Sequence, residues 1–441
     1  MITTFKRFFS ILLIIYVLVP LQAQGIQTNP VTPNPKINYE RLKRIDDVVN
    51  DFISKKYIAG AVTILVKDGQ VVQHKGYGYD DIDTKTPLSK DAIFRIASQT
   101  KAITSVGIMI LIEEGKLLLN DPISKYIPEF KKPIVIDKYN IEDTTYTTVP
   151  AKREITIKDL LTHTSGLGYA GIGSAQMRAI YAKNGIPAGL EQPNANLQEK
   201  IKALGKLPLE YQPGERFNYS LGDDVLGALI EQLSGMSLET FFKKRILDPL
   251  GMKDTYFNLP PDKHSRLAIL YMEDTLQQVV KIKTPNPDDN TLSKASRGNY
   301  SLGVNPDFPK LGMTYFSGGG GLSSTALDYA TFLQMLLNKG TYNGVEILSP
   351  QTVELMLRNQ IGDIPFGNNK FTLGFSTVTD KAADDICSVG TFSWGGAFAT
   401  SYWADPKQNM VYLVMTQQIP SSHSNDLKNK FLMAVYQSLK P

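Results

Sequence analysis

The N-terminal part of the chain carries a helical pattern followed by a hairpin pattern, and this order limits the folds that the chain can adopt. Apolar side chains recur at helical spacing over residues 39–53. Two β-prone runs follow, 61–66 and 71–74, and Asp68-Gly69 lies between them. An Asp-Gly pair between two such runs is a strong hairpin signal. We therefore expect a helix and an antiparallel strand pair at this end.

The C-terminal part repeats the same elements in reverse order. Strand-like runs occupy residues 397–403 and 410–416, and the polar segment 405–409 joins them. A helical pattern follows, with one apolar face made by Leu427, Phe431, Leu432 and Val435. The two ends together predict one antiparallel sheet that is covered by the terminal helices.

The middle of the chain is richer in helical signals. The segment from Thr156 to Asp159 resembles a capping box, and the helical run 225–233 is followed by Gly235, a residue typical of helix ends. We therefore predict an α/β fold with an all-helical region inserted into it. Residues 38–95 and 306–441 would form the α/β sheet domain, and residues 96–305 the helical domain.

The first residues have the composition of a secretory leader. Lys6 and Arg7 precede the apolar run 8–20, and Ala23 offers a cleavage point. The apolar run is shorter than the roughly twenty residues of a transmembrane helix, so cleavage is favoured over the alternative of an uncleaved anchor. We expect a signal peptide over residues 1–23 and a flexible leader over residues 24–37. The mature chain is then exported, periplasmic or secreted, and has no stable membrane span.

Composition argues against several other functions. The formal net charge is +4 and no basic stripe is present, so a nucleic-acid partner is not expected. Cys387, the only cysteine, is expected to be buried and structural rather than a catalytic thiol. Residues 318–321, four glycines without a following Lys-Ser/Thr, predict a flexible turn by a cleft rather than a phosphate loop. No metal or organic cofactor is expected, because metal-ligand spacing is absent among the four histidines, His74, His163, His264 and His423.

Ser98 and Lys101 lie three residues apart where a strongly helical run, 102–114, begins. Residues with this spacing share a helix face, so the lysine amine can reach the serine oxygen. Residues 108–112 are apolar on every side of the helix, which predicts that it is buried. Burial disfavours a charged lysine, so we expect a lowered pKa that makes Lys101 a usable base for Ser98. The spacing alone is a weak signal, because Ser-x-x-Lys also occurs by chance on helix surfaces.

Two later segments strengthen this signal. Tyr219 stands just before the second helical run, in the segment 213–220. The segment 392–397 reads Phe-Ser-Trp-Gly-Gly-Ala and has the character of a strand. Its paired glycines, Gly395 and Gly396, would let a substrate approach the backbone closely.

These three motifs occur together, in this order, in the penicillin-recognising enzymes. From about Asp46 to Gln437 the chain resembles the serine β-lactamase and penicillin-binding-protein superfamily, and within it the class C-like carboxylesterases and transesterases. The segments 94–98, 121–126 and 160–167 share the likeness. The resemblance implies a β-lactamase/transpeptidase-like fold.

The resemblance also implies a two-step acyl transfer. Ser98 would attack an ester or amide carbonyl, and Lys101 and Tyr219 would share the work of the general base. Tyr219 would then protonate the leaving group and activate the water that releases the acyl group. The backbone N–H groups of Ser98 and Ala397 would hold the oxyanion, where two such donors contribute several kcal/mol to the transition state.

Two departures from the family pattern bear on the substrate. Penicillin-recognising members usually carry Asn two residues after the tyrosine, and this chain has Leu221. They also carry Lys-Thr-Gly on the strand, where this chain has Trp394-Gly395-Gly396. An amide and a fixed cation are therefore missing, and Trp394 offers a flat apolar surface instead. We expect the substrate to be bordered by Leu221, Trp394, Gly395, Gly396 and Ala397. Esterases of the superfamily often share both departures.

We therefore expect an exported serine hydrolase that acts on a small-molecule ester or amide, with carboxylic esters favoured. A β-lactamase or a D-amino-acid peptidase that modifies peptidoglycan is the first alternative, because a lysine or arginine elsewhere could bind a carboxylate. A non-catalytic binding protein of the same fold is the second, although a pure binder gains nothing from Ser98, Lys101 and Tyr219. The sequence leaves the oligomeric state open.

Overall fold

The computed structural model describes residues 25–190, 194–282, 305–382 and 386–440. The predicted signal peptide lies outside the described residues. The segment that follows it is not a free leader: Gln27 pairs with the backbone of Gly69 and Val71, and Ile37 forms an isolated bridge with Leu439. The expected leader is thus anchored at Gln27 and Ile37, because backbone groups can pair whatever the polarity of their side chains.

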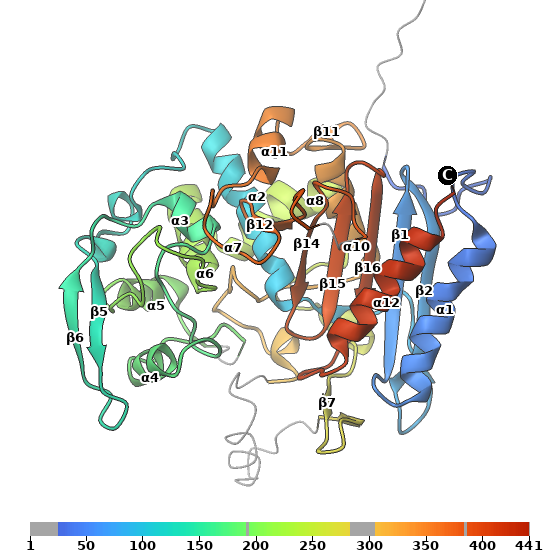
Figure 1. Ribbon diagram of the computed structural model, residues 1–441, viewed down its shortest axis with the longest axis horizontal. Coiled ribbons are helices and arrows are strands. Elements are labelled where there is room, and N and C mark those ends of the chain that lie inside the picture. Colours follow the sequence, from blue (N-terminus) through green and yellow to red (C-terminus); the bar gives the residue numbers. More distant parts are fainter. Residues whose placement is uncertain (1–24, 191–193, 283–304, 383–385, 441) are drawn as a thin grey trace, which may run out of the picture.

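An antiparallel sheet of eight strands forms the body of the molecule (Figure 1). The mirrored end patterns are confirmed: β1 pairs with β2 through the Asp68-Gly69 turn, and it pairs on its other edge with β16, with Val62 opposite Met415. The strands, in sheet order, are β12 (Lys370–Phe371), β13 (Ser376–Thr377), β14 (Phe392–Gly396), β15 (Thr400–Asp405), β16 (Met410–Met415), β1 (Gly60–Lys67), β2 (Gln70–Asp81) and β3 (Thr86–Pro87). The predicted strand 397–403 was wrong at its start, because 397–399 form the turn between β14 and β15.

Helices cover the sheet on both faces. The terminal helices α1 (Tyr39–Ser54) and α12 (Ser424–Gln437) lie side by side on one face (Figure 1). Successive residues of β1 alternate between the layers: Leu65 packs under the terminal helices, whereas Ile64 packs into the larger core on the other face. Every residue of β1 is therefore buried.

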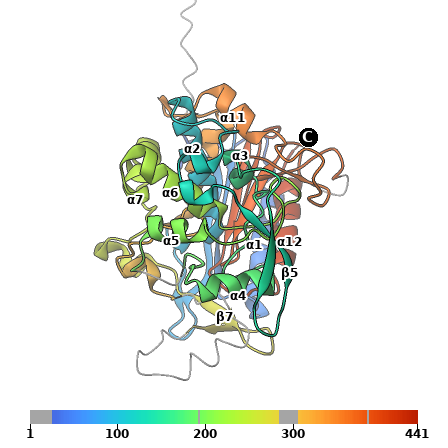
Figure 2. The ribbon, with the colours of Figure 1, turned by 90° about the vertical axis from the view of Figure 1, so that its left-hand side faces the viewer.

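The inserted region is largely helical, and Figure 2 looks onto it from its own side. Its described residues also form two hairpins, so the expectation of an all-helical region was too narrow. Its elements are α2 (Thr100–Glu113), β5 (Ile134–Tyr139), β6 (Tyr146–Pro150), α3 (Ile157–Leu161), α4 (Ala175–Lys183), α5 (Leu197–Leu204), α6 (Gly222–Ser234), α7 (Leu238–Phe242), α8 (Asp248–Leu250), β7 (Tyr271–Glu273) and β8 (Val279–Lys281). Elsewhere the chain forms β4 (Phe94–Arg95), β9 (Ser323–Ser324), α10 (Ala326–Leu337), β10 (Thr341–Tyr342), β11 (Val345–Glu346) and α11 (Pro350–Leu357).

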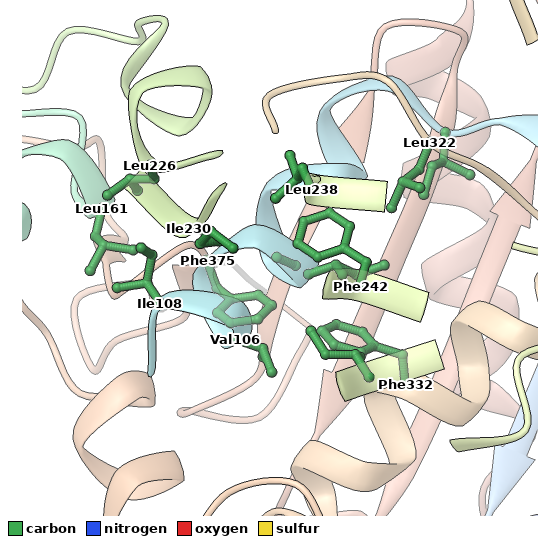
Figure 3. Packing of buried hydrophobic residues seen from close by; sticks show 14 of the residues in the cluster. Val106, Ile108, Leu161, Leu226, Ile230, Leu238, Phe242, Leu322, Phe332 and Phe375 are labelled. Carbon is green, nitrogen blue, oxygen red and sulfur yellow. The ribbon is translucent and has the colours of Figure 1, made fainter. Parts of the chain in front are cut away.

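Helix α2 runs through the centre of this core. All residues from Thr100 to Leu111 are buried, as the apolar run predicted. Figure 3 shows Val106 and Ile108 of α2 among apolar side chains that include Leu226 and Ile230 of α6. Both helix boundaries read from the sequence are confirmed: Thr156 and Asp159 form the capping box of α3, and Gly235 ends α6 in the left-handed conformation. In the described part of the chain, no helix is both long and apolar enough to cross a membrane.

Candidate active site

The segment before α2 presents Ser98 to solvent from buried surroundings. Ser98 lies in a single 3-10 turn, Ala97–Gln99, that leads into α2. Ala97 and Gln99 are buried, whereas Ser98 is partly exposed. The φ angle of Ala97 is +41°, a strained conformation for a residue with a side chain. Such strain is maintained only where the surrounding packing enforces it, and it is typical of functional turns.

Lys101 lies one helical turn further on and is buried, with 2% of its surface exposed. Its Nζ donates a hydrogen bond to the carbonyl oxygen of Gly319 over 2.6 Å. The same atom lies 4.7 Å from the ring centroid of Tyr219 and 5.4 Å from that of Tyr169. A carbonyl oxygen and two aromatic faces are partners for an ammonium group.

The pKa of Lys101 departs from the expectation. Burial alone acts to lower this pKa, but Tyr169, Tyr219 and Asp223 act in the opposite direction, and the balance raises it above its usual value. The prediction of a lowered lysine pKa was therefore wrong, because it considered desolvation without the groups that surround the amine. The raised pKa favours the ammonium form of Lys101.

Tyr219 projects from the segment just before α6 and is held by aromatic contacts on several sides. Its ring stacks on Tyr169 with centroids 5.7 Å apart, and it lies 4.6 Å from the ring of His163 and 5.8 Å from that of Trp394. Its hydroxyl is close enough to Lys101 to raise the pKa of that lysine, yet it makes no well-aligned hydrogen bond with any described residue. A positioned phenol with free hydrogen-bonding capacity is suited to proton transfer.

Strand β14 approaches the Ser98 turn at its last glycine. A Cβ atom on Gly396 would lie 2.3 Å from the carbonyl oxygen of Ile96, and one on Gly395 would lie 2.9 Å from that of Thr400. Both glycines were interpreted as leaving space for a substrate. At Gly396, however, the space that a side chain would need is filled by the backbone of Ile96. The glycine brings the turn that carries Ala397 against the turn that carries Ser98.

These residues line one open cleft of about 530 Å³. The structure brings together six of the predicted site residues on its surface: Ser98, Tyr219, Trp394, Gly395, Gly396 and Ala397. Lys101 lies beneath the cleft. Leu221 is not brought to it: the side chain is 1% exposed and packs in the core, while its backbone N–H donates to Gly168. The expectation that Leu221 faces the substrate is therefore not supported.

Trp394 belongs to an aromatic wall at this end of the cleft. Its ring lies 5.3 Å from that of Phe371 and 6.3 Å from that of Phe366. Phe217 packs against both phenylalanines, at 5.1 Å and 4.6 Å. Trp394 is the one of these four rings that lines the cleft, whereas Phe371 is buried behind it with its ring at 82° to that of Trp394. The apolar surface at this end of the cleft is therefore the Trp394 ring.

Two buried carboxyl groups lie behind the lysine at the start of α6. Asp223 is 2% exposed, and its Oδ2 lies 3.6 Å from Nε2 of His163. Burial raises the pKa of Asp223 to about 8, although the charge of Lys101 acts to lower it, and burial raises the pKa of Asp224 as well. Burial and the nearby Lys101 hold the pKa of His163 well below its usual value. His163 is thus neutral, and an acid behind the lysine gains or loses its proton near neutral pH.

Sequence reasoning missed three of these partners. Residues 318–321 are buried and carry the carbonyl that binds Lys101, so the expectation of a flexible turn was wrong. Gly319 is required there, because a Cβ atom would lie 2.8 Å from Asp224 Oδ2. Asp223 and Asp224, in the first turn of α6, were not singled out. Two adjacent acids opening an otherwise apolar helix were the available signal.

Other candidate groups occupy structural positions. Cys387 is buried beside Tyr412, as expected. Among the residues that the structure describes, no three His, Cys, Asp or Glu side chains are arranged to hold a metal ion.

The sequence was compared with those of known proteins. Residues 45–437 match the family model described as Beta-lactamase. Protein Rv1367c of Mycobacterium tuberculosis is 36% identical over 377 residues, which cover 82% of this chain and 86% of that protein. Esterase EstB of Burkholderia gladioli is 29% identical over 408 residues, which cover 89% of this chain and 94% of that protein.

Comparison with solved structures gives a similar result. The structure of EstCE1, described as a hydrolase with promiscuous acyltransferase activity, has a TM-score of 0.75 and 28% sequence identity to this chain. The match covers 90% of this chain and 99% of that one.

Proposed function

The chain belongs to the β-lactamase family and is a serine hydrolase, and from this premise we propose that it cleaves carboxylic esters through an acyl-enzyme on Ser98. The observation that carries the proposal is the convergence of Ser98, Lys101 and Tyr219 at one cleft with an aromatic wall. The similarity to an esterase and to a hydrolase with acyltransferase activity supports it.

In the first step Ser98 Oγ attacks the ester carbonyl carbon. The reaction takes place in molecules where the Lys101–Tyr219 pair has already lost one proton. In these molecules the proton of Ser98 Oγ passes to the Tyr219 oxygen. The Lys101 ammonium stabilises the negative charge on that oxygen, and the backbone N–H groups of Ser98 and Ala397 stabilise the oxyanion. The carbon–oxygen bond to the alcohol then breaks, the alcohol takes the proton from Tyr219, and Ser98 keeps the acyl group.

In the second step water attacks the acyl-enzyme. The Lys101–Tyr219 pair accepts one proton from the water and returns it to Ser98 Oγ as the serine leaves. The net products are a carboxylic acid and an alcohol. Nothing in either step requires a group beyond those of the chain and water.

The aromatic wall favours esters over β-lactams. Trp394 supplies apolar area where a lysine would hold a substrate carboxylate, so esters with an apolar acyl or aryl part gain contact without needing that charge. A β-lactamase or peptidase remains the second candidate, because Lys428 on α12 lines the same cleft and offers a cation at another position. The alternative of a non-catalytic binder predicts no covalent chemistry at Ser98.

Labelling with a fluorophosphonate probe tests the proposal. The wild-type protein should be labelled covalently at Ser98, and Ser98→Ala should lose the label while keeping its melting temperature. Equal labelling of both proteins would place the nucleophile elsewhere. Parallel assays with p-nitrophenyl butyrate and nitrocefin on the same preparation then separate an esterase from a β-lactamase.

We also propose that the chain is exported, on the basis of Lys6, Arg7 and the apolar run 8–20. N-terminal sequencing of the protein recovered from the periplasm or medium of an expressing cell should give a chain that begins at Gln24. Recovery only inside the cell, with residues 1–23 retained, would contradict export.

A further inference from the structure

One cation lies in the cleft and is not used by the proposed reaction. Lys428, in the second turn of α12, lines the same cleft as Ser98 and is only partly exposed. Burial lowers its pKa, and no described carboxylate offsets this effect. The neighbouring Lys430 differs, because it is exposed and pairs with Asp426 over 2.9 Å. A partly desolvated ammonium without a counter-charge is costly for the folded chain, so a negative ligand would stabilise it.

Several hydroxyl groups line the same cleft as this lysine. Ser421 and Ser424 lie seven and four residues before Lys428, and both line the same cavity. The Oγ of Ser421 is buried and has no hydrogen-bond partner among the described residues. Ser401 and Thr400 of β15 line the cavity as well, and Thr400 Oγ1 is likewise buried without a partner in the described chain. The hydroxyl donors and the ammonium provide what a carboxylate needs.

The first turn of α12 lies at the cleft, but its first N–H is already used. The Ser424 N–H donates to the Ser421 carbonyl oxygen, and Asp426 lies in the same turn. The attraction for an anion therefore comes from Lys428 and from the hydroxyl groups without a partner among the described residues. The cleft thus has an apolar region at Trp394 and a region suited to an anion at Lys428.

We propose that the Lys428 region binds a carboxylate of the substrate while Ser98 attacks its ester, so that the natural substrates are esters that carry a free carboxylate. This inference rests on the proposed function and names the substrate class for the same cleft. Lys428 and Ser421 then determine specificity, and Ser98, Lys101 and Tyr219 perform the reaction.

Two matched pairs of esters test the inference, one for each side of the ester bond. Mono-4-nitrophenyl adipate compared with 4-nitrophenyl hexanoate places the carboxylate on the acyl side. The ester 4-acetoxybenzoate compared with 4-acetoxybenzamide places it on the alcohol side. In at least one pair, Lys428→Met should lower kcat/KM for the charged ester by about ten- to a hundred-fold, the effect of losing a charge-assisted contact. The neutral partner should change less than about twofold, since surface changes of this kind have small effects.

Two control variants identify the cause. Lys430→Met removes a lysine from the same helix and should leave both ratios unchanged. Lys428→Arg keeps the charge and should retain most of the preference, which also covers the case in which Lys428→Met fails to fold. An equal loss for charged and neutral esters, or no loss for either, would overturn the carboxylate site.

A binding measurement separates this inference from the proposed function. Calorimetry with Ser98→Ala should detect 4-acetoxybenzoate, and Lys428→Met in that background should abolish the heat of binding. If the wild-type protein hydrolyses neither ester but this difference in binding is observed, the proposed function fails and the carboxylate site stands. If the esters are hydrolysed and no such difference is observed, the carboxylate site fails alone.

Discussion

Lys101 Nζ donates a 2.6 Å hydrogen bond to the carbonyl oxygen of Gly319, which lies 218 residues further along the chain. The same nitrogen lies 4.7 Å from the centroid of the Tyr219 ring. The position of the cation that stabilises the Tyr219 oxygen in the proposed reaction therefore depends on a loop that carries no chemistry of its own.

Gly319→Ala should displace the lysine. Its Cβ would lie 2.8 Å from Asp224 Oδ2 and 3.3 Å from Lys101 Nζ, so kcat should fall by about ten- to a hundred-fold, because small displacements of catalytic groups are costly. Gly320→Ala is the control, since its nearest neighbour, a Leu190 methyl carbon, would be at an ordinary 3.4 Å. Steady-state kinetics with p-nitrophenyl butyrate measures both variants. Similar losses of kcat for Gly319→Ala and Gly320→Ala would mean that the flexibility of the loop, rather than its contact with Lys101, determines the rate.

Tyr219→Phe should slow acylation about a hundred-fold or more, the range for losing a positioned acid–base group. The ring contacts with Tyr169 and Trp394 are kept, so the melting temperature should change little. Tyr169→Phe is the matched control, because it also removes one hydroxyl beside Lys101 but leaves Tyr219 in place. Single-turnover measurements report the acylation step directly. Unchanged rates for Tyr219→Phe would exclude a proton-transfer role.

Asp223→Asn should be more stable than the wild-type protein, and the difference in the free energy of unfolding should grow as pH rises. The folded-state pKa of Asp223 is about 8, against about 3.9 for a free aspartate, so the folded chain holds an extra proton between these values. The contribution of Asp223 to the free energy of unfolding therefore falls as pH rises from about 4 to about 8, and Asn removes that loss. At pH 8 the variant should be more stable by about 1 kcal/mol or more.

Denaturant unfolding at pH 5, 6.5 and 8 measures this effect. Asp426→Asn, at an exposed position of α12, is the control for the loss of one carboxyl group at the surface. A difference in the free energy of unfolding between Asp223→Asn and wild type that stays constant from pH 5 to pH 8 would mean that Asp223 is ionised in the folded chain at all of these pH values.

Substrate choice gives a further prediction. The ratio of kcat/KM for p-nitrophenyl butyrate to that for nitrocefin should be at least about a hundred, because two charge-assisted or amide contacts typical of β-lactam binding are missing. Trp394→Lys should lower this ratio. The substitution also removes contacts with Phe371 and Tyr219, which lowers stability, so the melting temperature of the variant must be measured. Lys428→Met should widen it, because nitrocefin carries a carboxylate. A ratio near one in the wild-type protein would favour the β-lactamase interpretation.

The sequence predicted those features that depend on neighbouring residues. The Asp68-Gly69 turn, the capping box at Thr156 and the end of α6 at Gly235 are local signals, and the structure has all of them. The family likeness gave the fold because its motifs are short and ordered. Four adjacent strands of the sheet, β15, β16, β1 and β2, follow from the two end patterns once β1 and β16 pair, whereas β3, β12 and β13 were not predicted.

Features set by distant residues were not predictable in the same way. The pKa direction of Lys101 depends on Tyr169, Tyr219 and Asp223, whose approach no periodicity reveals. Leu221 was misplaced because motif spacing does not give side-chain direction: it packs inward as the residue that precedes α6. The role of Lys428 is also non-local, since 330 residues separate it from Ser98.

The contact between Gly396 and the carbonyl of Ile96 joins a late segment of the chain to an early one. The active site can therefore be completed only near the end of synthesis. A polypeptide that has been synthesised only through α11 already contains Ser98, Lys101, Tyr219 and Gly319, yet it has no strand to close the turn that carries the serine. The oxyanion turn, the aromatic face of Trp394 and the cation of α12 all come from the last fifty residues. We therefore expect unfinished or C-terminally clipped molecules to be inert toward esters, and hydrolysis to begin only when the final hairpin has joined the first.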